Sequence, residues 1–192
     1  MNRRKFLYTG AAVTGSLLAT NAAGAETRSI TPLDLERHRF GVNYTPSRNW
    51  WFCWNDWDAN SIARDLDAIA ALGADHLRIL LVWPYFQPNP TYVSRLHLER
   101  LDQMLVLMEE RKLDAVVTVF TGQLSGWYFL PPFQNERDAY SAGEAFYSHA
   151  AMFKAQEMFV RELSRVMQRH GNIIGFDLGN EVNTCWSARP RS

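Results

Sequence analysis

Short apolar runs alternate with longer amphipathic stretches along this chain. The first apolar run, residues 40–44, predicts a strand, and residues 58–72 predict the helix that follows it. Within that helix Ile62, Leu66 and Ile69 recur at the spacing of one helix face, and Gly73 is suited to end it. The chain therefore opens with a predicted strand and helix pair.

Three further apolar runs predict strands at residues 76–83, 115–120 and 173–178. Helices are predicted at residues 97–112 and 151–169, and a long aromatic loop precedes the second of them. The run at residues 76–83 is nearly continuous in apolar side chains, as a parallel strand buried on both faces requires. Alternating strands and helices predict an α/β fold with a parallel sheet.

Two parallel architectures compete. A doubly wound sheet usually carries a glycine-rich phosphate turn after an early strand, but Tyr-Thr-Pro-Ser-Arg at residues 44–48 is no such turn. A (β/α)8 TIM barrel gathers polar and aromatic side chains at the ends of successive strands, and all four predicted strands end in such residues. We therefore expect a TIM barrel.

The length limits this expectation, because eight βα units need about 250 residues. Residues 26–192 offer only about the first four units, so we expect the N-terminal half of a barrel domain. The first and fourth strands would then be open edges, through which self-association is expected.

Residues 1–25 have the pattern of a removable signal peptide. Arg3, Arg4 and Lys5 form a positive start, a short apolar run follows, and Ala23-Gly24-Ala25 offers a cleavage site. The apolar run is too short to span a bilayer, so no stable membrane anchor is expected after cleavage. The twin arginine favours the twin-arginine export route to the periplasm or beyond. A general secretory signal and an uncleaved anchor remain as alternatives.

Charge and cysteine content exclude some functions. The chain has 20 basic and 20 acidic side chains, and loss of residues 1–25 would leave 17 against 20, a net charge of −3. That balance argues against a nucleic-acid partner and suits a neutral substrate. Cys53 and Cys185 match no metal motif, and free thiols are favoured over a disulfide. No cofactor and no metal are expected.

The strongest chemical candidate is Asn180-Glu181, at the end of the fourth predicted strand. Hydrolysis of a glycosidic bond needs one carboxylic acid to protonate the leaving oxygen and a second carboxylate on the other side of the sugar. An amide beside the acid could bind the sugar 2-hydroxyl. A coincidental Asn-Glu pair that caps the next element is the alternative.

The segment 173–181, Ile-Ile-Gly-Phe-Asp-Leu-Gly-Asn-Glu, resembles the fourth-strand signature of clan A glycoside hydrolases. Within the clan it is most similar to family five, the cellulases and β-mannanases. Leu77-Arg78-Ile79 and Gly41-Val42-Asn43 also resemble that family, and the similarity extends over about residues 38–186.

This resemblance implies a retaining O-glycoside hydrolase of β-linked glycans, with Glu181 as general acid/base and Asn180 on the 2-hydroxyl. Arg78 would lie beneath the site and hold the carboxylate of the nucleophile. The family's nucleophile is a second Glu after the seventh strand, and no residue here matches it. Phe-Thr-Gly-Gln at residues 120–123 also lacks the His that the family often has there.

Other residues at the strand ends are candidate substrate contacts: Asn43, Tyr44, Trp83 and Trp127. Indole rings stack on sugar rings, but at least half of the loop aromatics are expected only to pack loops onto the barrel. Arg78 could equally form an ion pair unrelated to a site. The leading hypothesis is a glycoside hydrolase on an oligo- or polysaccharide. A non-catalytic carbohydrate-binding half barrel is the alternative, whereas a metal hydrolase is disfavoured because His and Asp do not cluster at strand ends.

Overall fold

A computed structural model describes residues 38–134 and 150–182 of the chain, and they form a four-stranded parallel sheet. The strands are β1 (Gly41–Tyr44), β2 (His76–Leu80), β3 (Asp114–Thr121) and β6 (Ile173–Asn180). Their order across the sheet, β1-β2-β3-β6, is also their order along the chain. All four predicted strands are therefore confirmed, and each pairs with its neighbour in sequence.

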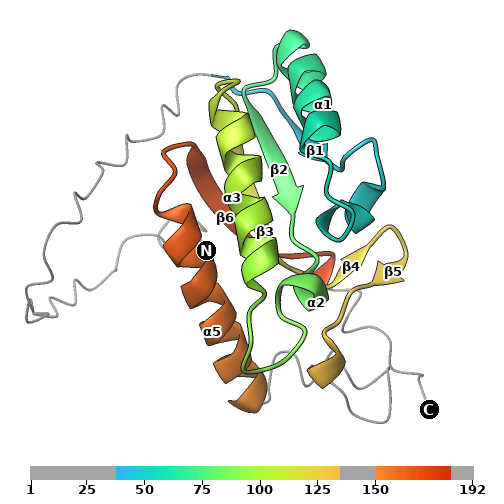
Figure 1. Ribbon diagram of the computed structural model, residues 1–192, viewed down its shortest axis with the longest axis vertical. Coiled ribbons are helices and arrows are strands. Elements are labelled where there is room, and N and C mark those ends of the chain that lie inside the picture. The colour runs from blue at the N-terminus through green and yellow to red at the C-terminus, as the bar shows by residue number, and fades with distance from the viewer. Residues whose placement is uncertain (1–37, 135–149, 183–192) are drawn as a thin grey trace, which may run out of the picture.

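Three long helices lie side by side over one face of this sheet, as Figure 1 shows. They are α1 (Ala59–Ala71), α3 (Arg95–Glu109) and α5 (Ala150–Met167). A doubly wound fold would reverse its strand order and place helices on both faces. Sequential parallel strands with their helices on a single face instead form part of a barrel wall, which confirms the expected TIM-barrel architecture.

The core lies between the sheet and the helices. The helix face predicted in α1 is confirmed, since Ile62 and Leu66 are buried there. The α1 helix begins where the Asp58 carboxylate accepts a hydrogen bond from the Ser61 N–H at 3.0 Å, which satisfies one unpaired donor of the first turn. Further fully buried side chains come from the strands and the other helices: Leu77, Ala115, Val117, Leu101, Leu105, Phe159 and Leu163.

The second strand is shorter than predicted. It ends at Leu80, and Trp83 begins a short helix, α2 (Trp83–Phe86). Pro84 stands in the first turn of this helix, where its fixed φ favours helix and its missing N–H is not needed. Trp83 therefore belongs to α2 and is not the last residue of the strand, as had been predicted.

Two 3-10 helices and a hairpin in the loops were not predicted. The first βα loop contains one 3-10 helix, η1 (Trp50–Trp54), and the long loop before α5 contains the other, η2 (Pro132–Gln134). Directly after β3 the chain forms a hairpin of β4 (Gln123–Leu124) and β5 (Trp127–Tyr128). Both η1 and the hairpin lie near the carboxyl ends of the parallel strands (Figure 1).

The signal peptide predicted at residues 1–25 and Cys185 lie outside the described residues, so export by the twin-arginine route stays a prediction. Within residues 38–134 and 150–182, no helix has the length and apolarity needed to cross a membrane.

The outer strand β6 exposes large apolar side chains, and this leads to a prediction for the chain on its own. Phe176 is 59% and Leu178 71% exposed, and β6 has no second neighbour in the described sheet. We expect purified residues 26–192 to self-associate, because unpaired strand edges and apolar patches favour association. The molar mass from light scattering should rise with concentration.

A matched pair of variants tests this surface. Phe176→Lys with Leu178→Lys should lower the associated fraction, whereas Leu72→Lys, at an exposed apolar position after α1, should not. A chain that remains monomeric at every concentration would show that the exposed strand does not drive association.

Candidate active site

The guanidinium of Arg78 joins three of the four parallel strands. Its Nε donates to Asp177 Oδ2 of β6 at 2.8 Å, and its Nη2 bonds to the same oxygen. Its Nη1 donates to Asn180 Oδ1 at 3.0 Å and to Asn43 Oδ1 at 3.4 Å. Asn43 and Arg78 are direct partners in the β1–β2 register, which explains why they meet. Three of the predicted site residues, Arg78, Asn43 and Asn180, are therefore brought together.

Asp177 is the carboxylate that Arg78 requires, and the sequence reasoning did not identify it. Its Oδ2 also accepts from Thr118 Oγ1 at 3.1 Å, and its Oδ1 from the Gly179 N–H at 3.2 Å. Burial alone would raise the pKa of Asp177, but the hydrogen bonds from Arg78 and Gly179 outweigh it and hold this pKa below its ordinary value. The sequence signal that could have identified Asp177 is a lone carboxylate within an apolar strand, because such a charge needs a partner.

Asn180 is held at both ends of its amide. Its Oδ1 accepts from Arg78, and its Nδ2 donates to the Gln123 carbonyl at 2.6 Å. These two contacts fix which way the amide points, because the oxygen faces a cation and the nitrogen faces a carbonyl. The Asn180 side chain therefore connects Arg78 of β2 to the β4–β5 hairpin.

Glu181 follows directly on Asn180, at the carboxyl edge of the sheet. Its side chain is exposed, and its backbone is left-handed with φ of 48°. For a residue other than glycine that conformation costs about 1–2 kcal/mol. Such strain often accompanies functional positions. Parallel α/β barrels carry their active sites at this edge, which is where Glu181 lies.

Tyr44 and Trp83 are placed differently from the expectation. Trp83 is fully buried; its Nε1 donates to Gln87 Oε1 at 2.7 Å and its ring packs edge-on against Phe120. The structure thus gives Trp83 no open face for a sugar, because the chain turns into α2 and carries the indole into the core. Tyr44 is 6% exposed and donates its hydroxyl to Asp65 at 3.0 Å, so it links the end of β1 to α1. Burial, and then the charge of Asp65, raise the Tyr44 pKa.

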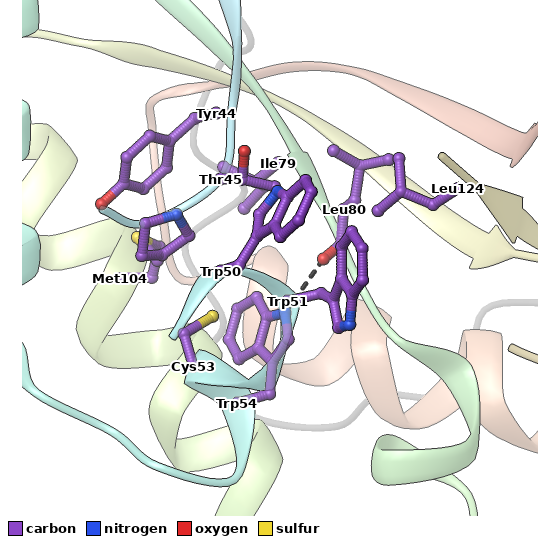
Figure 2. A pocket seen from close by; sticks show the side chains of 11 residues that line it. Tyr44, Thr45, Trp50, Trp51, Cys53, Trp54, Ile79, Leu80, Met104 and Leu124 are labelled. Carbon is purple, nitrogen blue, oxygen red and sulfur yellow. Dashed lines mark hydrogen bonds between the residues drawn. The ribbon is translucent and has the colours of Figure 1, made fainter. Parts of the chain in front are cut away.

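Some aromatic side chains of the loops are buried and others are exposed. Trp51 and Trp54 are buried, and Trp54 donates its Nε1 to the Leu80 carbonyl at 2.9 Å. Trp50 and Trp127 remain about half exposed, at 49% and 60%. Figure 2 shows the pocket that the η1 rings border above the end of β2. Several of the loop aromatics therefore pack loops onto the sheet, as expected, whereas the Trp127 ring remains exposed.

His97 and Cys53 lie in the core behind these loops. His97 is buried and bonds to Ser94 at 2.7 Å and Asn55 at 2.9 Å. Burial, helped by the charge of Arg100, lowers the His97 pKa to about 4, so the ring is neutral near pH 7. Cys53 is a free buried thiol whose pKa burial raises to about 12. Among the described residues, no three His, Cys, Asp or Glu side chains are grouped to hold a metal.

Neither a family model nor a curated protein matches the chain, but solved structures do. A GH5_18 protein from Bifidobacterium longum subsp. infantis is 39% identical with a TM-score of 0.71, covering 80% of this chain and 35% of its own. A glutamate-to-alanine GH5_18 variant from B. longum subsp. longum, in complex with Manβ1-4GlcNAc, is 37% identical with a TM-score of 0.71, covering 77% and 34%. The exo-β-1,4-mannosidase Op5Man5 from Opitutaceae bacterium strain TAV5 is 28% identical with a TM-score of 0.69, covering 76% and 25%.

The chain thus spans about a third of the length of the GH5_18 structures that it matches. The resemblance to family five that the strand motifs indicated is confirmed. The solved structures narrow it to the GH5_18 group, which the motifs alone did not identify. By sequence and fold, most of this chain matches about one third of the GH5_18 glycoside hydrolases of family 5.

Proposed function

We propose that this chain is part of a retaining glycoside hydrolase that cleaves a β-mannosidic bond, with Glu181 as its general acid/base. The observation that carries the proposal is the placement of Glu181 at the carboxyl end of β6, directly after an Asn180 amide that Arg78 and Gln123 hold. An acid can protonate a leaving oxygen efficiently only if the backbone and neighbours fix its position.

The substrate class comes from the relatives. One GH5_18 protein binds Manβ1-4GlcNAc, and Op5Man5 is an exo-β-1,4-mannosidase. We take a β-1,4-linked mannoside with N-acetylglucosamine as its leaving group as the substrate. A neutral disaccharide suits a site whose one described carboxylate besides Glu181, Asp177, is already neutralised by Arg78.

The reaction then has two steps. Glu181 gives its proton to the glycosidic oxygen as a second carboxylate attacks the anomeric carbon and forms a glycosyl-enzyme. Glu181, now a carboxylate, takes a proton from water, which attacks the same carbon and releases mannose with its β configuration retained. The second carboxylate is expected from the part of the enzyme that the chain, at about a third of its relatives' length, does not span.

We also propose that residues 1–25 are an export signal, which would place the site among glycans outside the cytoplasm.

The test is hydrolysis of Manβ1-4GlcNAc by the intact protein, meaning this chain together with the part that supplies the second carboxylate, followed by proton NMR. The first mannose released should be the β-anomer, which later equilibrates with the α-anomer. Early α-mannose would contradict the retaining mechanism. Binding of the disaccharide without any hydrolysis would favour a carbohydrate-binding protein, the alternative that the exposed Trp50 and Trp127 support.

A further inference from the structure

A main-chain carbonyl connects the β4–β5 hairpin to the candidate site. Thr121, the last residue of β3, pairs with Asn180 in the β3–β6 register. Two residues further on, the Gln123 carbonyl accepts a hydrogen bond from Asn180 Nδ2 at 2.6 Å. Because the acceptor belongs to the backbone, its position depends on the path that the hairpin takes and not on the Gln123 side chain.

The register of the hairpin turns this carbonyl towards Asn180. The Phe129 N–H donates to the Gly122 carbonyl at 2.8 Å, so these two residues form a hydrogen-bonded pair. Bonded and non-bonded pairs alternate in an antiparallel ladder. The next pair, Gln123 with Tyr128, is therefore a non-bonded one, whose carbonyls point away from the hairpin. A shift of the register by one residue would turn the Gln123 carbonyl into the ladder and away from Asn180.

The turn of the hairpin sets this register. Leu124 pairs with Trp127 across a turn of two residues. These turn residues, Ser125 and Gly126, have φ of 50° and 83°. Positive φ at both positions is typical of the type I′ turn, which matches the twist of a two-residue hairpin. A residue at position 126 that avoids positive φ would therefore disfavour the turn and the register that depends on it.

An aromatic contact holds the base of the hairpin. Phe129 is buried and lies edge-on against Trp51 of η1, with ring centroids 5.5 Å apart. Trp51 itself is 4% exposed. On the first strand of the hairpin, Leu124 lines the same pocket as Trp51 and Leu80 (Figure 2). Both strands of the hairpin are thus packed against the elements that surround the carboxyl end of β2.

The hairpin carbonyl limits how the Asn180 amide can turn. The last torsion of an Asn side chain is broad, so a single contact leaves the plane of the amide able to rotate. Arg78 Nη1 donates to Asn180 Oδ1 at 3.0 Å, and the Gln123 carbonyl accepts from its Nδ2. With both ends of the amide held, the direction of its second N–H is set as well. The hairpin thus controls the direction of a donor on the residue that precedes Glu181.

We propose that the β4–β5 hairpin is a positioning element for the reaction, because its register presents the Gln123 carbonyl that aligns the Asn180 amide. The inference rests on the proposed function, with the Asn180 amide on the sugar 2-hydroxyl as the family resemblance implies. A hydrogen bond to that hydroxyl strengthens in the transition state, so its misalignment lowers kcat while KM changes little. Gln123 and Gly126 are therefore positioning residues that act through Asn180.

The test is the steady-state hydrolysis of 4-nitrophenyl β-mannoside by the intact protein and by its Gly126→Val variant. A β-branched residue disfavours the positive φ of this position. A Cβ there meets nothing within 4 Å among the described residues, so the substitution changes the turn and not a neighbouring contact. The kcat should fall about tenfold to a hundredfold, as a displacement of about 1 Å can cause, and KM should change by less than about twofold.

Control variants separate alignment of the amide from loss of stability. Gly73→Val imposes the same strain just after α1, where φ is 84° and a Cβ likewise has no described neighbour within 4 Å. It should lower the thermal unfolding midpoint much as Gly126→Val does, but leave kcat unchanged. Gly126→Asn should keep most of the parent's kcat, because Asn tolerates a left-handed backbone. If Gly126→Val does not fold, Gly126→Ala tests the same turn with a smaller side chain.

A substrate without the 2-hydroxyl tests whether the hairpin acts through Asn180. On the 2-deoxy analogue of the same mannoside, the kcat of Gly126→Val should be within about twofold of the parent's, because the aligned donor has no hydroxyl to bind. Equal losses of kcat on both substrates would show a merely structural effect of the hairpin and would overturn the proposal. A parental kcat of Gly126→Val on the mannoside itself would also overturn it.

The same measurements keep the two proposals apart. If Glu181→Gln removes hydrolysis while Gly126→Val keeps the parent's kcat, the acid/base assignment stands and the positioning role fails. If Glu181→Gln leaves hydrolysis intact while Gly126→Val loses kcat on the mannoside but not on its 2-deoxy analogue, the positioning role stands and the acid/base assignment fails.

Discussion

Replacement of Glu181 with Gln is expected to lower kcat for Manβ1-4GlcNAc by about a hundredfold to ten-thousandfold, the range that a positioned general acid or base contributes. The N-acetylglucosamine oxygen is a poor leaving group unless it is protonated as the bond breaks. Gln has the shape of Glu but no transferable proton, and it can keep hydrogen bonds to neighbouring groups. Because Glu181 is exposed at the end of β6, the substitution should leave the fold intact.

The leaving group gives this prediction its sharpest test. A dinitrophenyl β-mannoside needs no proton to depart, so Glu181→Gln should still form the glycosyl-enzyme from it and then stall, because no base activates water. Rapid-mixing kinetics should show a burst of dinitrophenol, and added azide should raise the steady-state rate by attacking in place of water. Glu110→Gln, which changes a carboxylate at the end of α3, should behave like the parent. Equal losses on both substrates, without rescue by azide, would remove Glu181 from the acid/base role.

The framework of the fold was predictable because each element carries its own local signal. The α1 helix has a capping Asp58, an apolar face of Ile62 and Leu66 and a glycine after its end, and its observed bounds differ little from the predicted ones. The runs at residues 76–83 and 115–120 are nearly continuous in apolar side chains, which is typical of parallel strands. Sequential placement of four such strands then left a barrel wall as the simplest arrangement.

The errors arise where tertiary contacts override a local pattern. Trp83 was expected to face a ligand because it follows an apolar run, but Pro84 starts a helix there and the indole is buried beside Phe120. The β4–β5 hairpin has strands of two residues, which are too short for any periodicity. Its turn, Ser125-Gly126, is a recognisable dipeptide signal that could have indicated it.

The main residues of the candidate site could be predicted from the sequence, but the contacts between them could not. Asn180 and Glu181 were expected at the end of the fourth strand and Arg78 beneath the site, and the structure places Asn180 and Arg78 in contact. Asp177 was missed because its role depends on the pairing of β6 with β3, which brings it beside Thr118 and within reach of Arg78. The contact of Asp177 with Arg78 depends on the register of the sheet, which residue type alone does not predict.

Replacement of Arg78 with Met should lower the free energy of unfolding by about 1–3 kcal/mol at pH 7. The Met side chain fills similar space but leaves the Asp177 carboxylate partly buried without its cation. The side chains of Arg78 and Asp177 are 26% and 32% exposed, so the loss should be smaller than for a fully buried ion pair. Urea denaturation of the intact protein would measure it.

The pH dependence of this loss identifies its cause. The Asp177 pKa lies below its ordinary value of 3.8, so its ion pair stabilises the fold above about pH 4 and ceases to do so as the pH falls through the folded-state value. Without Arg78, burial raises the pKa of Asp177. Protonation of Asp177 then removes the unpaired charge that destabilises the variant. The difference in stability between the parent and Arg78→Met should therefore narrow as the pH is lowered from 7 towards 3.

A double-mutant cycle with Asp177→Asn completes the argument. The neutral amide of Asn needs no cation, so Arg78→Met combined with Asp177→Asn should be more stable than the sum of the two single losses predicts. Arg39→Met breaks separate ion pairs with Asp75 and Asp114, outside the Arg78 network, and should add to Asp177→Asn without coupling. If Arg78→Met and Asp177→Asn instead add within about 0.5 kcal/mol, the two residues act independently, and Arg78 does not owe its place beside Asn180 to the carboxylate on β6.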